Sequence, residues 1–516
     1  MDYFAALNQE EQSVLAHAPL VKRLFEASCA NRLSFHMPGH VSGRAYSQAL
    51  AGCFLSSDTT ELPQTEDLND PGPWLKETCD RLSRIYSSAQ TFLLTGGATQ
   101  AIQTALLALC GKGGRLLILS TAHRSFLYAA HLLDLELAVI SPGDPTQFSK
   151  ASDNTSLFVA PDPIAIERYL ARAQKNGQLP HVLALTHPDY YGQLAPVKAV
   201  ADICHRYGVW LLVDEAHGAL WPFDPPDQPC LPLGALHQAA DVVVHSAHKT
   251  LPALTPTAML HLGHGLVQQC PQMRERVQQA LRLLQTSSPS LMQAATVDWA
   301  AALLAVRGGA WVCRHLPDLT KLRADLSALP GFRCLCPPDQ TTFDPFRLVI
   351  HTGGHACALL LAEQLQAEGI DVEMADLTRL VLIVSPFHTS VDFDRLREVL
   401  SNFSRSGGQT ESETKRLNQL DRAYTKWCTR DHLQVDVQDL LPQVDAWIQV
   451  PLHQAAGQIL ALPLVPYPPG VVLAYPGERL SADLLSFLSA ICDYGLSVQG
   501  IEQVNGQRCV PCRIGR

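Results

Sequence analysis

The residue that best indicates chemistry in this chain is a lysine that follows an apolar run. Lys249 lies in the segment 243–251, Val-Val-His-Ser-Ala-His-Lys-Thr-Leu. A second apolar run, Val-Trp-Leu-Leu-Val at 209–213, ends at Asp214. A lysine amine can form a Schiff base with an aldehyde cofactor, and a buried carboxylate can hold a pyridine nitrogen protonated. The two runs together therefore indicate pyridoxal phosphate chemistry.

A glycine-rich turn upstream is a candidate for binding the phosphate of such a cofactor. Residues 94–100 read Leu-Thr-Gly-Gly-Ala-Thr-Gln, between the apolar pair 92–93 and a helix expected to begin near residue 98. Backbone N–H groups at a helix start bind phosphate, and glycines allow a close approach. A simple strand-to-helix turn has the same composition, so Lys249 decides the interpretation. The candidate phosphate contacts are Gly97, Ala98 and Thr99.

Three histidines and a serine extend the candidate site. His123 follows the expected strand 116–119, so it would emerge at the carboxyl edge of the sheet, where its ring could stack on a pyridine. His217 could touch the cofactor or the substrate, and Ser246 and His248 could reach the phosphate or cover the ring. Each also has an ordinary explanation as a loop, cap or solvated residue. Their grouping around the lysine and aspartate runs favours a chemical role.

Strand-like and helix-like segments alternate from about residue 74 to 260. Short apolar runs predict strands at 116–119, 135–140, 181–185, 209–213 and 242–244. Amphipathic stretches predict helices at 98–110, 122–134 and 196–207. This alternation predicts an α/β fold with a mostly parallel sheet covered on both faces.

Changes in pattern divide the chain into five expected parts. The stretch 404–415 contains no apolar residue and reads as a linker. The expected parts are an N-terminal helix and loop segment at 1–73, a large cofactor-binding domain at 74–310, a small α+β domain at 311–403, the linker at 404–415 and a C-terminal α+β domain at 416–516.

The overall composition excludes several classes of protein. The chain has 516 residues, 47% of them apolar and 17% charged, as in an ordinary folded protein. Its net charge of −10 argues against a nucleic-acid partner. We find no signal peptide or credible membrane span, and the 15 cysteines read as reduced thiols, so we expect a cytoplasmic protein with no membrane partner. Cys509 and Cys512 lack a second pair at zinc-site spacing, and we expect no metal.

The motifs as a set resemble the Orn/Lys/Arg decarboxylase family of aspartate-aminotransferase fold, in its short bacterial form. The His-Lys-Thr-Leu and Tyr-Pro-Pro-Gly elements are specific to that family, whereas the Asp–Lys pair indicates only the superfamily. The matching segments lie at 35–40, 60–62, 67–68, 71–72, 95–99, 186–192, 213–219, 245–255, 285–290, 466–470 and 476–478.

The resemblance implies a fold, a cofactor and roles for residues. The fold would be the pyridoxal-phosphate fold type I, and the cofactor pyridoxal 5'-phosphate. Lys249 would be the Schiff-base lysine, Asp214 the pyridinium partner and His217 a group over the reacting carbon. His123 would stack on the ring. Ser246 and His248 would approach the phosphate with Gly97, Ala98 and Thr99.

The resemblance also implies a homo-oligomer, a dimer or a multiple of dimers, with active sites shared between subunits. Segments 60–68 and 285–290 would face the partner. The substrate would be lysine, ornithine or arginine, and an acidic group must meet its distal cation. The candidates are Glu61, Glu66, Asp67 and Glu478.

Some positions depart from the family pattern, and alternatives to a decarboxylase remain. The turn at 95–98 has fewer hydroxyls than usual, Asp189 replaces a threonine, Leu220 a histidine, and 471–472 is Val-Val instead of Ile-Pro. We expect release of carbon dioxide and a di- or polyamine: cadaverine, putrescine or agmatine. The alternatives are an aminotransferase, with Arg347 holding the substrate carboxylate, another carbon–carbon lyase, or a non-catalytic paralogue.

Overall fold

The structure is a computed structural model of the whole chain. It describes residues 9, 17–29, 32–61, 65–143, 160–225, 227, 229–334, 342–354, 357–405, 410–435, 437, 440, 446–467 and 470–514.

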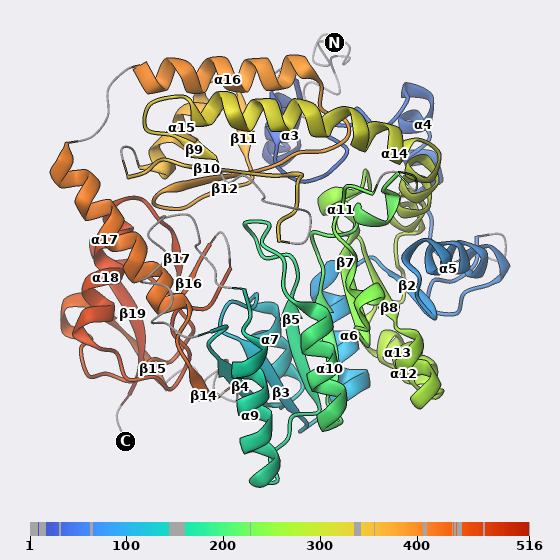
Figure 1. Cartoon of the computed structure of the whole chain (residues 1–516), viewed down its shortest axis with the longest axis horizontal. Helices are drawn as coiled ribbons and strands as arrows, with labels where there is room; N and C mark the ends of the chain where they lie inside the picture. The colour runs from blue at the N-terminus through green and yellow to red at the C-terminus, as the bar shows by residue number, and fades with distance from the viewer. Residues whose placement is uncertain are drawn as a thin grey trace.

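A mostly parallel sheet forms the centre of the large domain (Figure 1). Its strands, in spatial order, are β14 (His432–Val435), β4 (Glu136–Ile140), β3 (Arg115–Leu119), β5 (Val182–Thr186), β6 (Trp210–Asp214), β7 (Val242–Ser246), β8 (Ala258–Leu262) and β2 (Gln90–Leu94). The strands from β4 to β7 run parallel, whereas β8, β2 and β14 pair antiparallel. The carboxyl ends of β5, β6 and β7 therefore meet at one edge.

Helices cover both faces of this sheet, because successive side chains of a buried strand point to opposite sides. They are α5 (Pro73–Tyr86), α6 (Gly97–Cys110), α7 (Ser125–Leu132), α9 (Pro163–Lys175), α10 (Val197–Tyr207), α11 (Ala247–Thr250), α12 (His264–Gln269) and α13 (Met273–Leu284). One apolar core joins α6, α7 and α13 to one face, and a second joins α9 and α10 to the other.

The small domain is built on an antiparallel sheet with the order β12-β13-β10-β9. Its elements are α14 (Leu291–Ser327), β9 (Arg333–Cys334), β10 (Arg347–His351), α15 (Ala358–Ala367), β11 (Ile370–Val372), β12 (Met374–Ala375), β13 (Arg379–Ile383) and α16 (Ser390–Arg405). The N-terminal segment adds α3 (Pro19–Cys29), β1 (Leu33–Phe35) and α4 (Gln48–Gly52), and β1 pairs in parallel with β11.

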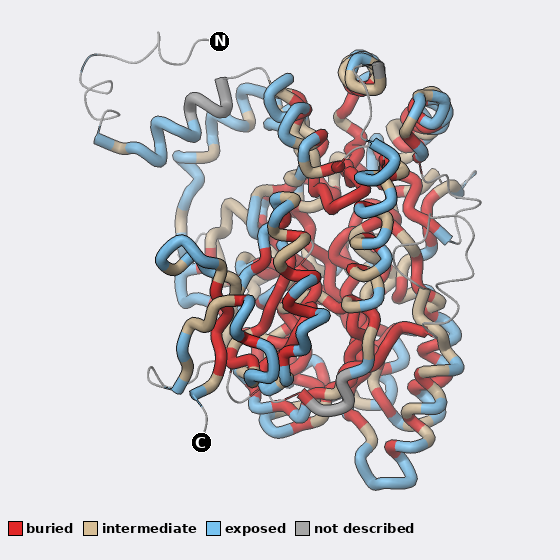
Figure 2. The backbone as a smooth tube through the Cα atoms, turned by 90° about the vertical axis from the view of Figure 1, so that its left-hand side faces the viewer, coloured by how far each residue is buried: buried red, intermediate tan, exposed pale blue. Residues whose placement is uncertain are grey.

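Among its described residues, the C-terminal part carries two helices and two small sheets. Its elements are α17 (Glu411–Cys428), β15 (Trp447–Pro451), β16 (Val465–Pro466), α18 (Ala482–Asp493), β17 (Val498–Gln499), β18 (Glu502–Val504) and β19 (Gln507–Arg513). Short 3-10 turns occur at Leu55–Ser57, Trp221–Phe223, Ala235–Gln238 and Leu452–Gln454. In Figure 2 the buried backbone is concentrated in the centre of the molecule, and the N-terminal segment is largely exposed.

The predicted strands and helices of the large domain are confirmed to within a few residues. The domain boundaries remain predictions, but two helices run across them, and one strand of the C-terminal part joins the sheet of the large domain. α14 runs unbroken through the boundary placed at 310. α17 begins inside the polar stretch 404–415, because Thr410 and Glu413 form a capping box that starts a helix. β14, from the C-terminal part, joins the edge of the large sheet.

Candidate active site

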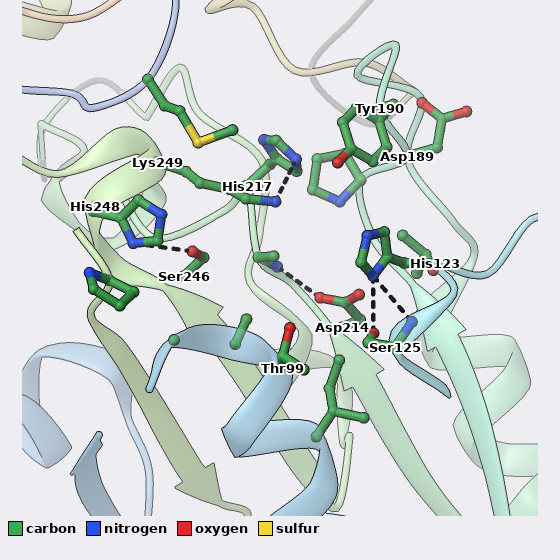
Figure 3. Close-up of a pocket in the computed structure, with 18 of the residues that line it drawn as sticks. Thr99, His123, Ser125, Asp189, Tyr190, Asp214, His217, Ser246, His248 and Lys249 are labelled. Atoms are coloured by element: carbon green, nitrogen blue, oxygen red, sulfur yellow. Dashed lines mark hydrogen bonds between the residues drawn. The ribbon is translucent and has the colours of Figure 1, made fainter. Parts of the chain in front are cut away.

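A cavity of about 270 Å³ lies at the carboxyl ends of β5, β6 and β7, beside the first turn of α6 (Figure 3). Ligands bind at this edge in open parallel sheets. Every residue expected to bind the cofactor lines it. They are Gly97, Ala98, Thr99, His123, Asp214, His217, Ser246, His248 and Lys249.

Lys249 projects into the cavity from α11, the short helix that follows β7. Its Nζ lies 3.1 Å from Nε2 of His217 and 5.5 Å from the ring centre of Tyr190. Burial lowers the pKa of Lys249, although the Asp214 and Glu373 carboxylates act in the opposite direction. Since burial also lowers the pKa of His217 well below its usual value, the pair favours a neutral imidazole beside a more nucleophilic amine.

Asp214 is the last residue of β6 and is buried in the wall of the cavity. Its Oδ1 accepts a hydrogen bond from the backbone N–H of Ala216 at 3.2 Å. Burial raises the pKa of Asp214, and the charge of Lys249 opposes that rise. A carboxylate so placed gains most from a cationic N–H donor, which is what a protonated pyridine nitrogen offers.

His123 stands between β3 and α7 and faces the cavity. Its Nδ1 lies 2.9 Å from the hydroxyl of Ser125, which fixes one edge of the ring. Burial, with the charges of Lys249 and Arg124, lowers the pKa of His123 to about 3. The lowered pKa favours the neutral form of the ring, and its planar face can stack on another aromatic ring.

The glycine turn and the residues around Lys249 form a polar pocket at the start of α6. Gly97 has a φ of +72°, a conformation that glycine adopts without strain. Ser246 Oγ lies 3.4 Å from Nδ1 of His248, and that nitrogen is 3.1 Å from the carbonyl oxygen of Thr257. A helix start with hydroxyl and imidazole groups beside it can bind a phosphate.

Several cavity residues were not selected from the sequence. Tyr190 stacks edge-on against His217, with ring centres 5.1 Å apart. Thr186 also lines the cavity, and its buried Oγ1, like Nδ1 of His217, has no hydrogen-bond partner among the described residues. Tyr467 enters from the C-terminal part. Tyr190 and Tyr467 belong to the motifs 186–192 and 466–470, so the family motifs could have indicated both residues.

The four acidic residues expected to contact the substrate lie outside the lining of this cavity. Glu66 accepts hydrogen bonds from the N–H groups of Trp74 and Leu75 at the start of α5. Glu478 pairs with Arg430 at 2.8 Å. Asp67 accepts the N–H of Asn69, and Glu61 is exposed.

No cluster of metal-ligating side chains occurs among the residues that the structure describes. Cys509 and Cys512 are both buried free thiols in β19. Burial raises the pKa of Cys512 to about 11, which disfavours the thiolate that a metal or redox role requires.

The residues present fit pyridoxal phosphate. A lysine of lowered pKa, a buried carboxylate, a neutral histidine ring and a glycine turn at a helix start converge in one cavity. The buried hydroxyl of Thr186 and the buried Nδ1 of His217 provide further polar groups for a ligand.

Comparison with known families agrees with this geometry. The family model for the major domain of Orn/Lys/Arg decarboxylases matches residues 18–338, and the model for their C-terminal domain matches residues 437–509. The chain belongs to the Orn/Lys/Arg decarboxylase family. It is accordingly a pyridoxal-phosphate-dependent amino-acid decarboxylase, a carboxy-lyase that acts on a basic amino acid.

Relatives of this decarboxylase match along nearly its whole length. An arginine decarboxylase of Bacillus subtilis is 27% identical, with 94% of this chain and 95% of that protein covered. An uncharacterized B. subtilis protein, YaaO, is 28% identical over 94% of this chain and 96% of its own length. An arginine decarboxylase of Bacillus anthracis is 26% identical, covering 95% and 96%.

Solved structures confirm fold type I for the decarboxylase. The constitutive lysine decarboxylase of Escherichia coli superposes with a TM-score of 0.71 at 21% identity, covering 96% of this chain and 82% of that one. A structure described as SPT with PLP gives a TM-score of 0.54 at 16% identity, over 73% and 88%. Among the described residues, no helix combines the length and apolar character needed to cross a membrane.

Proposed function

We propose that this decarboxylase converts arginine, lysine or ornithine to agmatine, cadaverine or putrescine, with carbon dioxide as the second product. The observation that carries the proposal is the hydrogen bond of Lys249 to His217, in the cavity that Asp214 also lines. Relatives named arginine decarboxylase and lysine decarboxylase support a basic substrate. We also propose that the enzyme works in the cytoplasm and supplies polyamine synthesis.

Each side chain of the cavity has a separate task. When bound, pyridoxal phosphate accepts the electron pair that remains on the α-carbon after carbon dioxide leaves. Asp214 would hold the ring nitrogen protonated, and His123 would fix the ring plane. The start of α6, Ser246 and His248 would hold the phosphate.

Proton transfer at the α-carbon would fall to the Lys249–His217 pair. The lowered pKa of Lys249 lets its amine give up a proton near neutral pH more readily than an ordinary lysine does. The lowered pKa of His217 favours the neutral imidazole, which can accept that proton. The ring of Tyr190 packs beside both groups and shields them from solvent. This shielding favours protonation by the enzyme over uncontrolled exchange with water.

The distal cation of the substrate would be met by a second subunit. We propose a homo-oligomer, based on dimers, in which the segments 60–68 and 285–290 face the partner. Glu66 and Glu478 already accept structural hydrogen bonds. Glu61 is exposed and is the candidate whose carboxylate is accessible to a partner's substrate.

One observation keeps an aminotransferase as the second candidate. Arg347, in β10, is only 1% exposed, and its Nε and Nη1 have no hydrogen-bond partner among the described residues. A buried guanidinium of this kind suits a carboxylate ligand. Its charge acts on Lys249 and His217, so it lies near the site.

Product analysis separates these candidates. The purified protein is loaded with pyridoxal phosphate and incubated with arginine, lysine or ornithine, with and without 2-oxoglutarate. We expect one amine to accumulate with equimolar carbon dioxide, independent of the keto acid. Transfer of the amino group to 2-oxoglutarate with no release of carbon dioxide would establish the aminotransferase. A protein that binds no cofactor would establish the non-catalytic paralogue.

A further inference from the structure

The C-terminal part reaches the cavity through a loop that packs against His123. Tyr467 and Val471, on either side of that loop, both line the cavity. Val471 forms an antiparallel bridge with His123, and the carbonyl of Gly470 accepts the backbone N–H of Arg124 at 2.9 Å. The Arg124 guanidinium lies 4.6 Å from the ring centre of Tyr467. These three contacts fix the 123–124 turn from a segment that lies more than 340 residues later in the chain.

Gly470 lies against the ring of His123. A Cβ built on Gly470 would lie 3.0 Å from both Cδ2 and Nε2 of His123, which is too close without movement. The φ of Gly470 is +85°, a conformation that few other residues adopt. Its N–H donates to the carbonyl of Pro466 at 2.9 Å, which ties Gly470 itself to β16.

The two edges of the His123 ring are therefore held by different parts of the protein. Ser125, in α7, meets Nδ1 at 2.9 Å, and the backbone of Gly470 closes the Cδ2–Nε2 edge. A ring held on both edges can present only its faces to a ligand. Face-on contact is the geometry that stacking on a pyridine requires.

We propose that Gly470 is a positioning residue that sets the plane of His123, so that the C-terminal domain completes the cofactor pocket. The inference rests on the proposed stacking role of His123. A Cβ at position 470 requires the His123 ring or the Gly470 backbone to move by a few tenths of an ångström, which would turn the ring away from the plane that stacking needs. The C-terminal domain then contributes to cofactor affinity without contributing a side chain at this point.

A double-mutant cycle on cofactor affinity tests this inference. The dissociation constant of pyridoxal phosphate is measured by fluorescence titration of the full-length apo-protein, for wild type, His123→Ala, Gly470→Ala and the double variant. Loss of a stacked aromatic contact corresponds to about a three- to tenfold weakening. We expect this for each single variant, and no further loss in the double variant, because both act through one ring.

Gly457→Ala is the matched control. Gly457 lies in the same domain with a φ of +81°, and a Cβ there would meet no atom within 4 Å. It therefore reproduces the backbone strain of Gly470→Ala without the contact to His123. We expect Gly457→Ala to retain wild-type affinity and the wild-type visible circular dichroism of the bound cofactor, and Gly470→Ala to change both.

Three results would overturn the inference. These are additive losses in the double variant, equal losses in Gly470→Ala and Gly457→Ala, or an unchanged affinity in His123→Ala. The proposed substrate class is tested separately, since the cycle reads cofactor binding alone. A protein that shows the coupling but releases no carbon dioxide would refute the substrate proposal and leave the positioning role intact.

Discussion

The Nζ of Lys249 lies 3.1 Å from Nε2 of His217, and burial lowers the pKa of both groups. Lys249 lies in the short helix α11 directly after β7, and His217 lies in the turn after β6, the parallel neighbour of β7. Strand pairing therefore fixes their separation, and Tyr190 packs against both. This arrangement makes His217 the nearest partner for a proton on the Lys249 amine.

Replacing His217 should separate catalysis from cofactor binding. We expect His217→Ala to lower kcat by about 10²–10⁴-fold, the usual contribution of a positioned acid or base. The amount of pyridoxyl group that borohydride traps on Lys249 should equal that of wild type, because the variant retains the lysine. Steady-state kinetics and peptide mapping measure the two effects. An unchanged kcat would remove His217 from the proton-transfer step.

Asp214→Asn should retain the shape of the cavity and remove its charge. We expect kcat to fall by about 10²–10³-fold, as when one pre-organised electrostatic contact is lost. The neutral amide no longer holds the ring nitrogen protonated, so the visible spectrum of the bound cofactor should also change. Wild-type kcat in Asp214→Asn would show that this carboxylate does not serve the cofactor.

Glu215, directly after β6, connects the strand β7, the residue that follows β5 and the 3-10 turn Ala235–Gln238. Its Oε2 lies 2.7 Å from Nε2 of His245, its Oε1 accepts the N–H of Ala235 at 2.8 Å, and Nε2 of His187 is 3.7 Å away. We expect Glu215→Ala to lower the free energy of unfolding by about 3–5 kcal/mol, because it leaves buried polar groups unpaired. Urea unfolding of the apo-protein measures this change.

The control for that experiment is Glu411→Ala. Glu411 pairs with Lys415 at 2.8 Å, but its side chain is 83% exposed. We expect this variant to unfold at almost the wild-type urea concentration, because exposed ion pairs contribute little. Equal destabilisation by the two variants would contradict the bridging role of Glu215.

His123 should make the apo-protein less stable in acid, because its surroundings disfavour the protonated ring. Its folded pKa, about 3, is far below the ordinary value of 6.5, so between these pH values only the unfolded chain binds the proton. The contribution of His123 is therefore fully present above pH 6.5 and is lost as pH falls toward 3. We expect wild type to lose about 2 kcal/mol more than His123→Phe between pH 7 and pH 4.5. Urea unfolding at both pH values measures this difference. Equal losses of unfolding free energy in wild type and His123→Phe would show that the folded protein does not disfavour the protonated ring.

The sequence was sufficient for the parts of the fold that depend on local pattern. The strands leading to Asp214 and Ser246 follow from short apolar runs, and their carboxyl ends must meet in a parallel sheet. The nine residues expected around the cofactor do line one cavity. Their individual roles remain proposals that the variants above test.

Long-range contacts could not be read from local pattern. Nothing near His123 indicates that Gly470 and Val471 pack against it, because their contact depends on how the C-terminal part folds back. Similarly, the acidic character of Glu66 and Glu478 suggested a substrate contact. In the fold the Glu66 carboxylate accepts backbone N–H groups at the start of α5, and the Glu478 carboxylate pairs with Arg430. The continuous α14 crosses 310 although Gly308 and Gly309 stand directly before it, because these glycines pack closely against Phe223 and Pro225, and Pro317 is accommodated within the helix.

The most direct test of the central claim is carbon dioxide release from carboxyl-labelled arginine, lysine and ornithine, by wild type and Lys249→Ala loaded with pyridoxal phosphate. The account predicts release from one of the three substrates by wild type and none above background by Lys249→Ala. Equal release by both proteins, or none by a cofactor-loaded wild type, would contradict it.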